Sequence, residues 1–133
     1  MTFSHRRRES RGQALVEFAL VIPIFLLVLI GIFEGGRAVY IYNALSNAVR
    51  EGLREAIVHQ DDAAINAEID RILGAIADDS VITIDKSDCG TPIKLPCSYR
   101  IEIRNTFSPI FIGAIFRPVI AAEGEMAVEA KNP

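Results

Sequence analysis

The chain has 133 residues, of which 50% are hydrophobic and 23% are charged, with a formal net charge of −3. This length allows at most one small globular domain. The first twelve residues carry four Arg and one Glu, which gives +3, so the remaining 121 carry ten basic and sixteen acidic side chains, which gives −6. An acidic body behind a short basic head argues against a nucleic-acid-binding domain, which needs clustered Lys and Arg to neutralise phosphates.

The most apolar stretch lies directly behind the basic head. Residues 14–33 read ALVEFALVIPIFLLVLIGIF, and Glu17 is their only charged residue. Twenty helical residues at about 1.5 Å each cover roughly 30 Å, the thickness of the hydrocarbon core of a bilayer. A buried helix of a soluble protein is the alternative, but such a helix carries polar residues on its outer face, and residues 18–33 have none. The stretch therefore predicts a transmembrane segment at residues 14–33.

The flanking charges predict how this segment is oriented. Four Arg precede it and only Arg37 lies close behind it. The positive-inside rule then makes residues 1–12 a basic cytoplasmic leader and leaves residues 34–133 outside. A cleaved secretory signal peptide fits less well, because the apolar stretch is longer than usual and no A-x-A-like site follows it.

Glu17 is the unusual residue of the segment. An acid in a membrane helix costs about 2.5 to 3.5 kcal/mol at mid-bilayer. Glu17 could reach the cytoplasmic interface, or pair with Arg11 or the other leader arginines. Alternatively, a cut after Gly12 would free the α-amino group of Gln13, whose reference pKa of about 7.7 to 8 keeps it mostly cationic near neutrality. Glu17 would then be the fifth residue of the mature chain, and it could neutralise this amine within one chain or between staggered chains.

A family resemblance points to the second alternative. The run GQALVEF from Gly12 to Phe18, preceded by arginines, resembles the cleavage region of type IV-pilin-like proteins. More specifically, residues 11–56 are similar to the N-terminal signature of the TadE-like family of tight-adherence (Flp) pilus systems. The chain departs from the major Flp pilins by having Phe18 where they favour Tyr, and by a far larger C-terminal domain. Both departures indicate a minor pilin or pseudopilin-like subunit.

The resemblance also implies partners and a location. A prepilin peptidase on the cytoplasmic side would cut between Gly12 and Gln13, and a glycine suits an extended, protease-accessible junction. The implied partners are this peptidase, the lipid bilayer, the major Flp pilin, other minor pilins and the inner-membrane pilus assembly platform. The protein would be a single-pass protein of the inner (cytoplasmic) membrane that acts in assembly or initiation of a type IVc-like adhesion pilus, and it could reach the extracellular pilus after assembly.

Beyond the membrane segment the apolar pattern becomes periodic. One stripe at spacings of three and four residues predicts that a single helix continues to His59, so that the long helix covers residues 13–59. Irregularity is expected at Pro23 and at Gly35–Gly36. The stripe is either a core face or an interface with neighbouring helices, and it comprises Ala38, Ile41, Leu45, Ala48, Gly52 and Ala56, with Tyr42, Val49 and Leu53 alongside.

Residues 60–133 predict a small outer domain. An amphipathic pattern indicates a second helix at about residues 62–77, a β-branched run indicates a strand at 81–84, and two alternating segments indicate strands at 99–104 and about 120–130. The fold class is therefore α+β: a long N-terminal helix that is transmembrane and then amphipathic, a second helix, and a roughly three-stranded antiparallel sheet.

One segment of this domain, SPIFIGAIFRPV at residues 108–119, is strongly apolar but does not alternate. It is too apolar for an ordinary exposed loop. Three interpretations remain: a core loop that covers a sheet face, a surface that enters the outer leaflet, or a docking site for another subunit.

Cys89 and Cys97 are the only cysteines of the chain. They form no CxxC motif and no zinc-ligand set. In an oxidising exterior compartment they are expected to pair, closing a short loop that contributes roughly 2 to 3 kcal/mol, whereas inside the cell they would remain free thiols.

The residues that could carry catalysis are few. His5 lies in the leader, His59 lies at a helix end, and the pairs Asp61–Asp62 and Asp78–Asp79 lie at helix boundaries, where Asp often caps a helix. No phosphate-binding glycine motif is present. We therefore expect no enzyme, no catalytic residue, no cofactor and no metal. A membrane-anchored outer-face adaptor or binding module is the alternative to a filament subunit, but an adaptor needs neither Gly12 nor Glu17 in this register.

Overall fold

The computed structural model describes residues 6–59, 61–86, 97–111 and 113–128. The chain forms two compact units, residues 1–36 and residues 37–133. The positions of the two units relative to one another are not determined, so each unit is described by itself.

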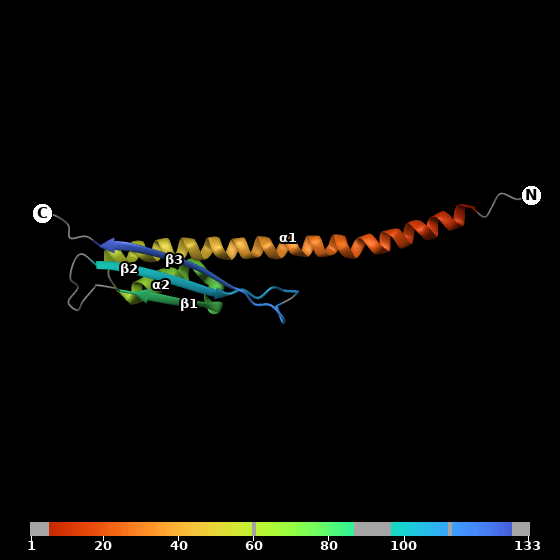
Figure 1. The fold of residues 1–133 in the computed structure, drawn as a ribbon. Coiled ribbons are helices and arrows are strands. Elements are labelled where there is room, and N and C mark those ends of the chain that lie inside the picture. The colour runs from red at the N-terminus through yellow and green to blue at the C-terminus, as the bar shows by residue number, and fades with distance from the viewer. Residues whose placement is uncertain (1–5, 60, 87–96, 112, 129–133) are drawn as a thin grey trace, which may run out of the picture. The chain divides into compact units, whose positions relative to one another are not determined.

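The long helix α1 spans Arg6–His59 (Figure 1). It begins earlier than the predicted start at Gln13, because the Arg and Glu residues of the leader are good helix formers. Pro23 lies inside the helix, and the helical assignment also continues through Gly35 and Gly36. The irregularity expected at these positions does not end the helix.

The second unit contains the last part of α1 and all the remaining elements. In chain order these are α2 (Asp62–Leu73), the 3-10 helix η1 (Gly74–Asp79), β1 (Ser80–Asp85), β2 (Cys97–Thr106) and β3 (Val119–Val128). The three strands form one sheet in the order β1-β2-β3 with antiparallel neighbours. The predicted α+β class and the antiparallel sheet are confirmed.

Local sequence explains where α2 begins and ends. The carboxylate of Asp61 accepts a hydrogen bond of 3.1 Å from the backbone N–H of Ala63, which caps the first turn. Gly74 has a φ of +53°, a left-handed conformation that interrupts regular α-helix. The second helix therefore stops at Leu73 rather than at the predicted residue 77, and the chain continues as η1.

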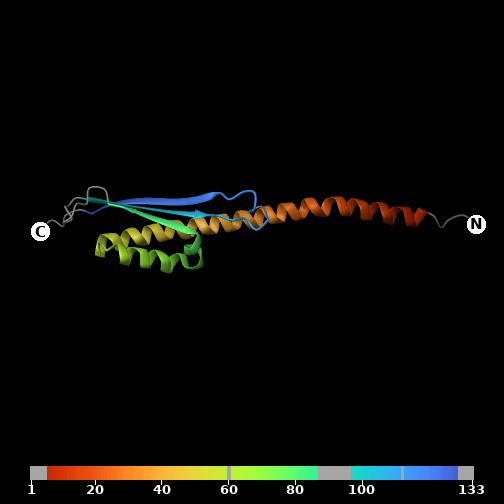
Figure 2. The ribbon, with the colours of Figure 1, turned by 90° about the horizontal axis from the view of Figure 1, so that it is seen from below.

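The core of the second unit lies between the sheet and two helices. Figure 2 shows α2 beside the last part of α1, with the three strands on one side of this helix pair. Alternate residues of β2 are buried toward the helices, because successive side chains of a strand point to opposite faces. From residue 45 onward the apolar stripe of α1 is therefore a core face, as its buried members show: Leu45, Ala48, Val49, Gly52, Leu53 and Ala56.

The sheet approaches α1 closely at Gly124. A Cβ atom built there would lie 2.8 Å from Val49 Cγ1 and 2.9 Å from Leu53 Cδ1. Both distances are shorter than carbon atoms tolerate, so a side chain at this position would force Val49 and Leu53 to shift in the core.

We expect Gly124→Val to destabilise the second unit by about 1 to 3 kcal/mol, because the added carbons overpack the core. The exposed Ala121, on the same strand, is the matched control, and Ala121→Val is expected to be nearly neutral. Thermal unfolding of the detergent-solubilised full chain, followed by near-ultraviolet circular dichroism of its tyrosines, measures both variants. Equal melting temperatures for the two would contradict the close approach.

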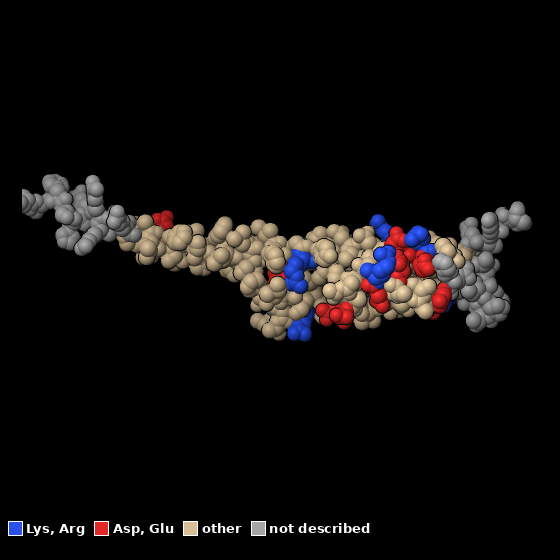
Figure 3. Space-filling model, turned by 180° about the vertical axis from the view of Figure 1, so that it is seen from behind, with Lys and Arg blue, Asp and Glu red and all other residues tan. Residues whose placement is uncertain are grey.

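The outer face of the sheet is charged. Figure 3 looks onto the opposite, helix side of the second unit, where Lys, Arg, Asp and Glu side chains also gather. Arg100 donates to Glu125 across the β2–β3 pair at 2.7 Å, and this hydrogen bond is the main cause that holds the pKa of Glu125 below its usual value. Arg104 similarly donates to Glu102 at 2.6 Å. Both pairs are solvent-exposed, so they favour solubility more than stability.

The connection between β2 and β3 corrects one expectation from the sequence. Ile110, Phe111, Ile115 and Phe116 are each more than half exposed, and Ile115 is 92% exposed. The interpretation of residues 108–119 as a core loop that covers the sheet is therefore wrong for these four side chains. Only smaller or flanking parts of the segment are buried, such as Phe107 and Pro109.

Cys97 begins β2 and is only 3% exposed. Its expected partner Cys89 lies outside the described residues, so the disulfide between them stays a prediction.

Candidate processing and subunit-pairing site

The residues of the predicted cleavage site lie on α1 in the first unit. Gly12 and Gln13 are consecutive residues of this helix, and Glu17 follows Gln13 by four residues. All three are exposed. In the structure the Gly12–Gln13 peptide bond is helical rather than extended, so cleavage there would require this turn to unwind first.

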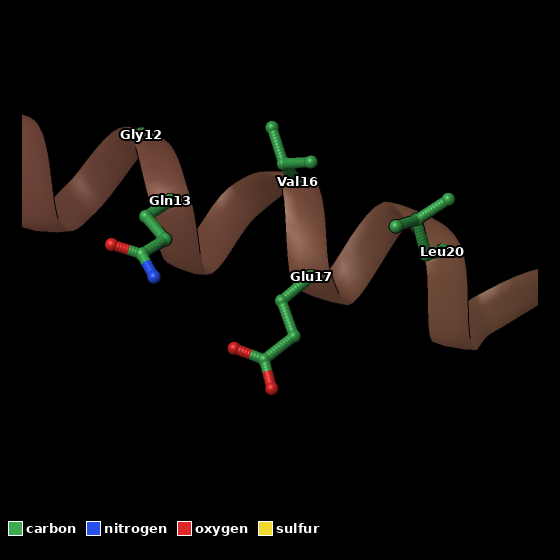
Figure 4. Close-up of a pocket in the computed structure, with 5 residues that line it drawn as sticks. All are labelled: Gly12, Gln13, Val16, Glu17 and Leu20. Atoms are coloured by element: carbon green, nitrogen blue, oxygen red, sulfur yellow. The ribbon is translucent and has the colours of Figure 1, made fainter.

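Figure 4 shows the geometry of this surface. Gln13 and Glu17 extend from the same face of the helix one turn apart, whereas Val16 and Leu20 project from another side. Gly12 joins these four residues in lining a shallow hollow on the helix surface. Residues four apart in a helix are neighbours, so an amine at Gln13 would lie within reach of the Glu17 carboxylate.

Gly12 has no packing role within its own chain. A Cβ atom built at this position would meet nothing within 4 Å, and its backbone does not adopt a positive φ. The folded chain therefore does not itself require glycine at position 12. An effect of a larger side chain there on processing would report on the partner that handles this bond.

Among the side chains that the structure describes, none forms an ion pair with Glu17. Its neighbours Val16, Phe18 and Leu20 are apolar and exposed. In hydrocarbon a carboxylate in such surroundings must be neutralised or must reach water.

The apolar helix around the site is uncovered. Between Gly12 and Val58 the chain has a helix long and apolar enough to cross a membrane, and none of its most apolar window is buried within the protein. Fully burying one Val, Leu, Ile or Phe side chain gains about 1.5 to 3 kcal/mol, so leaving this run in water is strongly unfavourable. The helix is suited to a single-pass membrane anchor that lipid or neighbouring helices would cover.

The other predicted site residues lie apart from this surface. Pro23 is on the same helix beyond Leu20, and Cys97 is in the second unit. The structure thus brings together Gln13 and Glu17. Within the described ranges, no group of three or more His, Cys, Asp and Glu side chains is arranged to hold a metal ion.

A comparison with protein families matches residues 12–54 to the model of the TadE-like protein family. Comparisons with curated proteins and with solved structures find no match. The matched segment is about a third of the chain, and it begins at Gly12 and includes Gln13, Glu17, the membrane-type run and most of the buried stripe of α1. The chain therefore carries a TadE-like segment over residues 12–54, as its N-terminal sequence predicted.

Proposed function

We propose that this chain is a Tad pilus-associated protein, and specifically a minor pilin or pseudopilin-like subunit that acts in assembly or initiation of the pilus. One observation carries the proposal. The segment that matches the TadE-like family opens on an uncovered apolar run, residues 14–33, whose only acid, Glu17, lies one turn from the residue that cleavage would make N-terminal. A filament subunit needs such a helix, because it exchanges lipid for the helices of its neighbours.

The proposed location is the inner membrane, with the N-terminus in the cytoplasm and the second unit outside. The charge of the leader supports this orientation, since four Arg precede the apolar run. The same orientation would place Cys89 and Cys97 in an oxidising compartment, where we expect them to pair.

Processing by a prepilin peptidase between Gly12 and Gln13 gives the leader a physical role. Four arginines hold the N-terminus on the cytoplasmic side and oppose withdrawal of the helix from the bilayer. A cut after Gly12 removes all four and leaves one new cation, the α-amino group of Gln13, opposite the carboxylate of Glu17. The mature helix then begins with a neutral pair and can leave the membrane at a lower electrostatic cost.

The pair can form within one chain or between chains, and only the second geometry recruits a neighbour. Between chains, the amine of an incoming subunit neutralises Glu17 of a subunit already in place. Because an unpaired charge in hydrocarbon costs several kcal/mol, this contact favours the staggered arrangement in which both charges are satisfied. We assign Glu17 this role, with the major pilin and other minor pilins as its partners and the inner-membrane assembly platform as the place where they meet.

The proposed function can be tested by asking whether the chain is present in surface fibres sheared from cells. We expect a C-terminally tagged chain to be recovered in sheared fibres as well as in membranes, and to disappear from the fibres when the prepilin peptidase is deleted. An integral membrane protein of the same cells, absent from the sheared fraction, controls for membrane contamination. A chain found only in membranes, with or without the peptidase, would favour an anchored adaptor over a filament subunit.

A further inference from the structure

The loop between β2 and β3, here the described residues 107–111 and 113–118, is unusual in composition for a surface connection. From Thr106 to Ala122 the sequence holds one charged residue, Arg117. Exposed loops of soluble domains are normally rich in polar and turn-forming residues. This loop instead carries four large apolar side chains, and the proposed role in a filament does not account for them.

Backbone hydrogen bonds give this loop a defined shape. At its base the N–H of Phe107 donates to the carbonyl of Pro118 at 2.9 Å. Nearer the tip the N–H of Gly113 donates to the carbonyl of Pro109 at 2.9 Å, in a turn so tight that a Cβ atom at Gly113 would collide with that carbonyl. The loop is therefore a closed and projecting turn.

The apolar side chains of the turn are not covered by the second unit. Ile110, Phe111 and Phe116 are each more than half exposed, and Ile115 is almost completely exposed. Large apolar patches of this kind mark surfaces that contact a membrane or another protein. A projecting turn, unlike a groove, is suited to insertion into a soft apolar medium.

Contacts with Arg37 place the base of the loop beside the first residue of the second unit. The guanidinium of Arg37 donates to the carbonyl of Ser108 at 3.5 Å and lies 5.1 Å from the ring centroid of Phe107. The predicted membrane segment ends at Phe33, four residues earlier in the chain. Four residues span at most about 14 Å even when fully extended. The Cα atom of Arg37, which holds the base of the loop, is therefore tethered within about 14 Å of the Cα atom of Phe33.

We propose that the β2–β3 loop is a second membrane contact, which inserts Ile110, Phe111, Ile115 and Phe116 into the interface of the leaflet that faces the second unit. Surface-bound apolar elements are typically buried about 5 to 10 Å into the boundary between head groups and acyl chains. Two cations accompany this contact: Arg117, whose Nε donates to the Gly113 carbonyl at 2.8 Å, and Arg37, which donates to the Ser108 carbonyl. Both have the charge to bind phospholipid phosphates. The proposal requires that residues 14–33 span the membrane, but it requires neither cleavage nor filament assembly.

Single tryptophans test this contact directly, because the natural chain contains none. The full-length chain is reconstituted in phosphatidylcholine and phosphatidylglycerol vesicles as Phe111→Trp and Phe116→Trp. Met126→Trp is the matched control, since Met126 is also exposed on β3 but pairs with Tyr99 near the opposite end of the sheet. Leu26→Trp verifies that the membrane segment is inserted. Emission wavelength, quenching by brominated phospholipids and quenching by aqueous iodide are measured for each variant.

We expect the emission of both loop tryptophans to shift to shorter wavelength, to be quenched by brominated lipids and to resist iodide, whereas Met126→Trp behaves in the opposite way. Adding Ile115→Asp to Phe116→Trp is expected to reverse the loop signal without unfolding, because residue 115 makes almost no contact with the rest of the protein. Loop tryptophans that iodide reaches as easily as it reaches Met126→Trp would overturn the proposal. Blue-shifted emission without quenching by brominated lipids would do so too, since another protein surface would then cover the loop.

The vesicle measurements and the fibre assay together separate this proposal from the proposed function. Quenched loop tryptophans in a chain that never enters fibres would support the membrane contact and contradict the filament subunit. Fibre assembly by a chain whose loop tryptophans stay in water would support the filament subunit and contradict the membrane contact.

Discussion

The variant Gly12→Ile is expected to accumulate as the full-length precursor in the membrane, with little or no mature chain. The first reason is steric, because a β-branched side chain has to fit the protease subsite that glycine occupies. The second is that isoleucine stabilises the helical turn that has to unwind before cleavage. Glycine is about 1 kcal/mol less favourable than alanine in a helix, and isoleucine is intermediate. Immunoblots that resolve precursor from mature chain, in cells with and without the peptidase, measure the effect.

A matched control is available on the same helix. A Cβ atom at Gly31, as at Gly12, would meet nothing within 4 Å. Gly31→Ile therefore introduces the same side chain into the same uncovered helix, away from the predicted cut, and is expected to be processed normally. Mature protein of normal size from Gly12→Ile, or an equal loss of processing in both variants, would remove the case for cleavage after Gly12.

The second large effect is expected for Glu17→Ala. Removal of the only charge in the apolar run favours insertion by as much as about 2.5 to 3.5 kcal/mol at mid-bilayer, and by less near the interface. On transfer energetics alone, the variant should therefore remain as abundant in membranes as the parent. If Glu17 pairs with the N-terminal amine of a neighbour, the variant is inserted and cleaved but is lost from sheared fibres and no longer co-purifies with the other pilins.

Two conservative variants distinguish the charge of residue 17 from its size as the property needed for assembly. Glu17→Gln keeps the size and loses the charge, so it is expected to fail in assembly as Glu17→Ala does. Glu17→Asp keeps the charge and is expected to retain part of the activity. Membrane abundance and processing, measured on the same cells, are the controls. Assembly of Glu17→Ala at the level of the parent would make Glu17 an interface-seeking residue and would remove the main physical support for subunit pairing.

Sequence patterns predicted the elements whose periodicity is strong. The uninterrupted apolar run predicted the uncovered half of α1, and the alternation of Tyr99, Ile101 and Ile103 with charged residues predicted the buried face of β2. The apolar run fits a helix that lipid or neighbouring helices cover, and the alternation fits a strand with one buried face, so both patterns can be recognised in the sequence alone. The resemblance of residues 11–56 to the TadE-like family is confirmed over residues 12–54, which the family model matches.

Other features depend on backbone conformation or on tertiary contacts. The end of α2 at Leu73 follows from the positive φ of Gly74, and the glycine at 124 follows from its approach to Val49 and Leu53. Neither follows from hydrophobic periodicity. The sequence also showed that residues 108–119 are apolar, but hydropathy alone does not distinguish a loop folded onto the sheet from a loop projecting into its surroundings. The exposure of Ile110, Phe111, Ile115 and Phe116 in the structure decides between the two.

The mass of the N-terminal peptide tests the central claim most directly. The chain is purified separately from sheared surface fibres and from membranes of the same cells, digested, and analysed for its first peptide. The proposed function predicts that the chain in fibres begins at Gln13, and that the membrane fraction contains this form together with the precursor. Fibres that contain a chain still carrying residues 1–12, or fibres that lack the chain while the membrane form keeps its leader, would contradict the account.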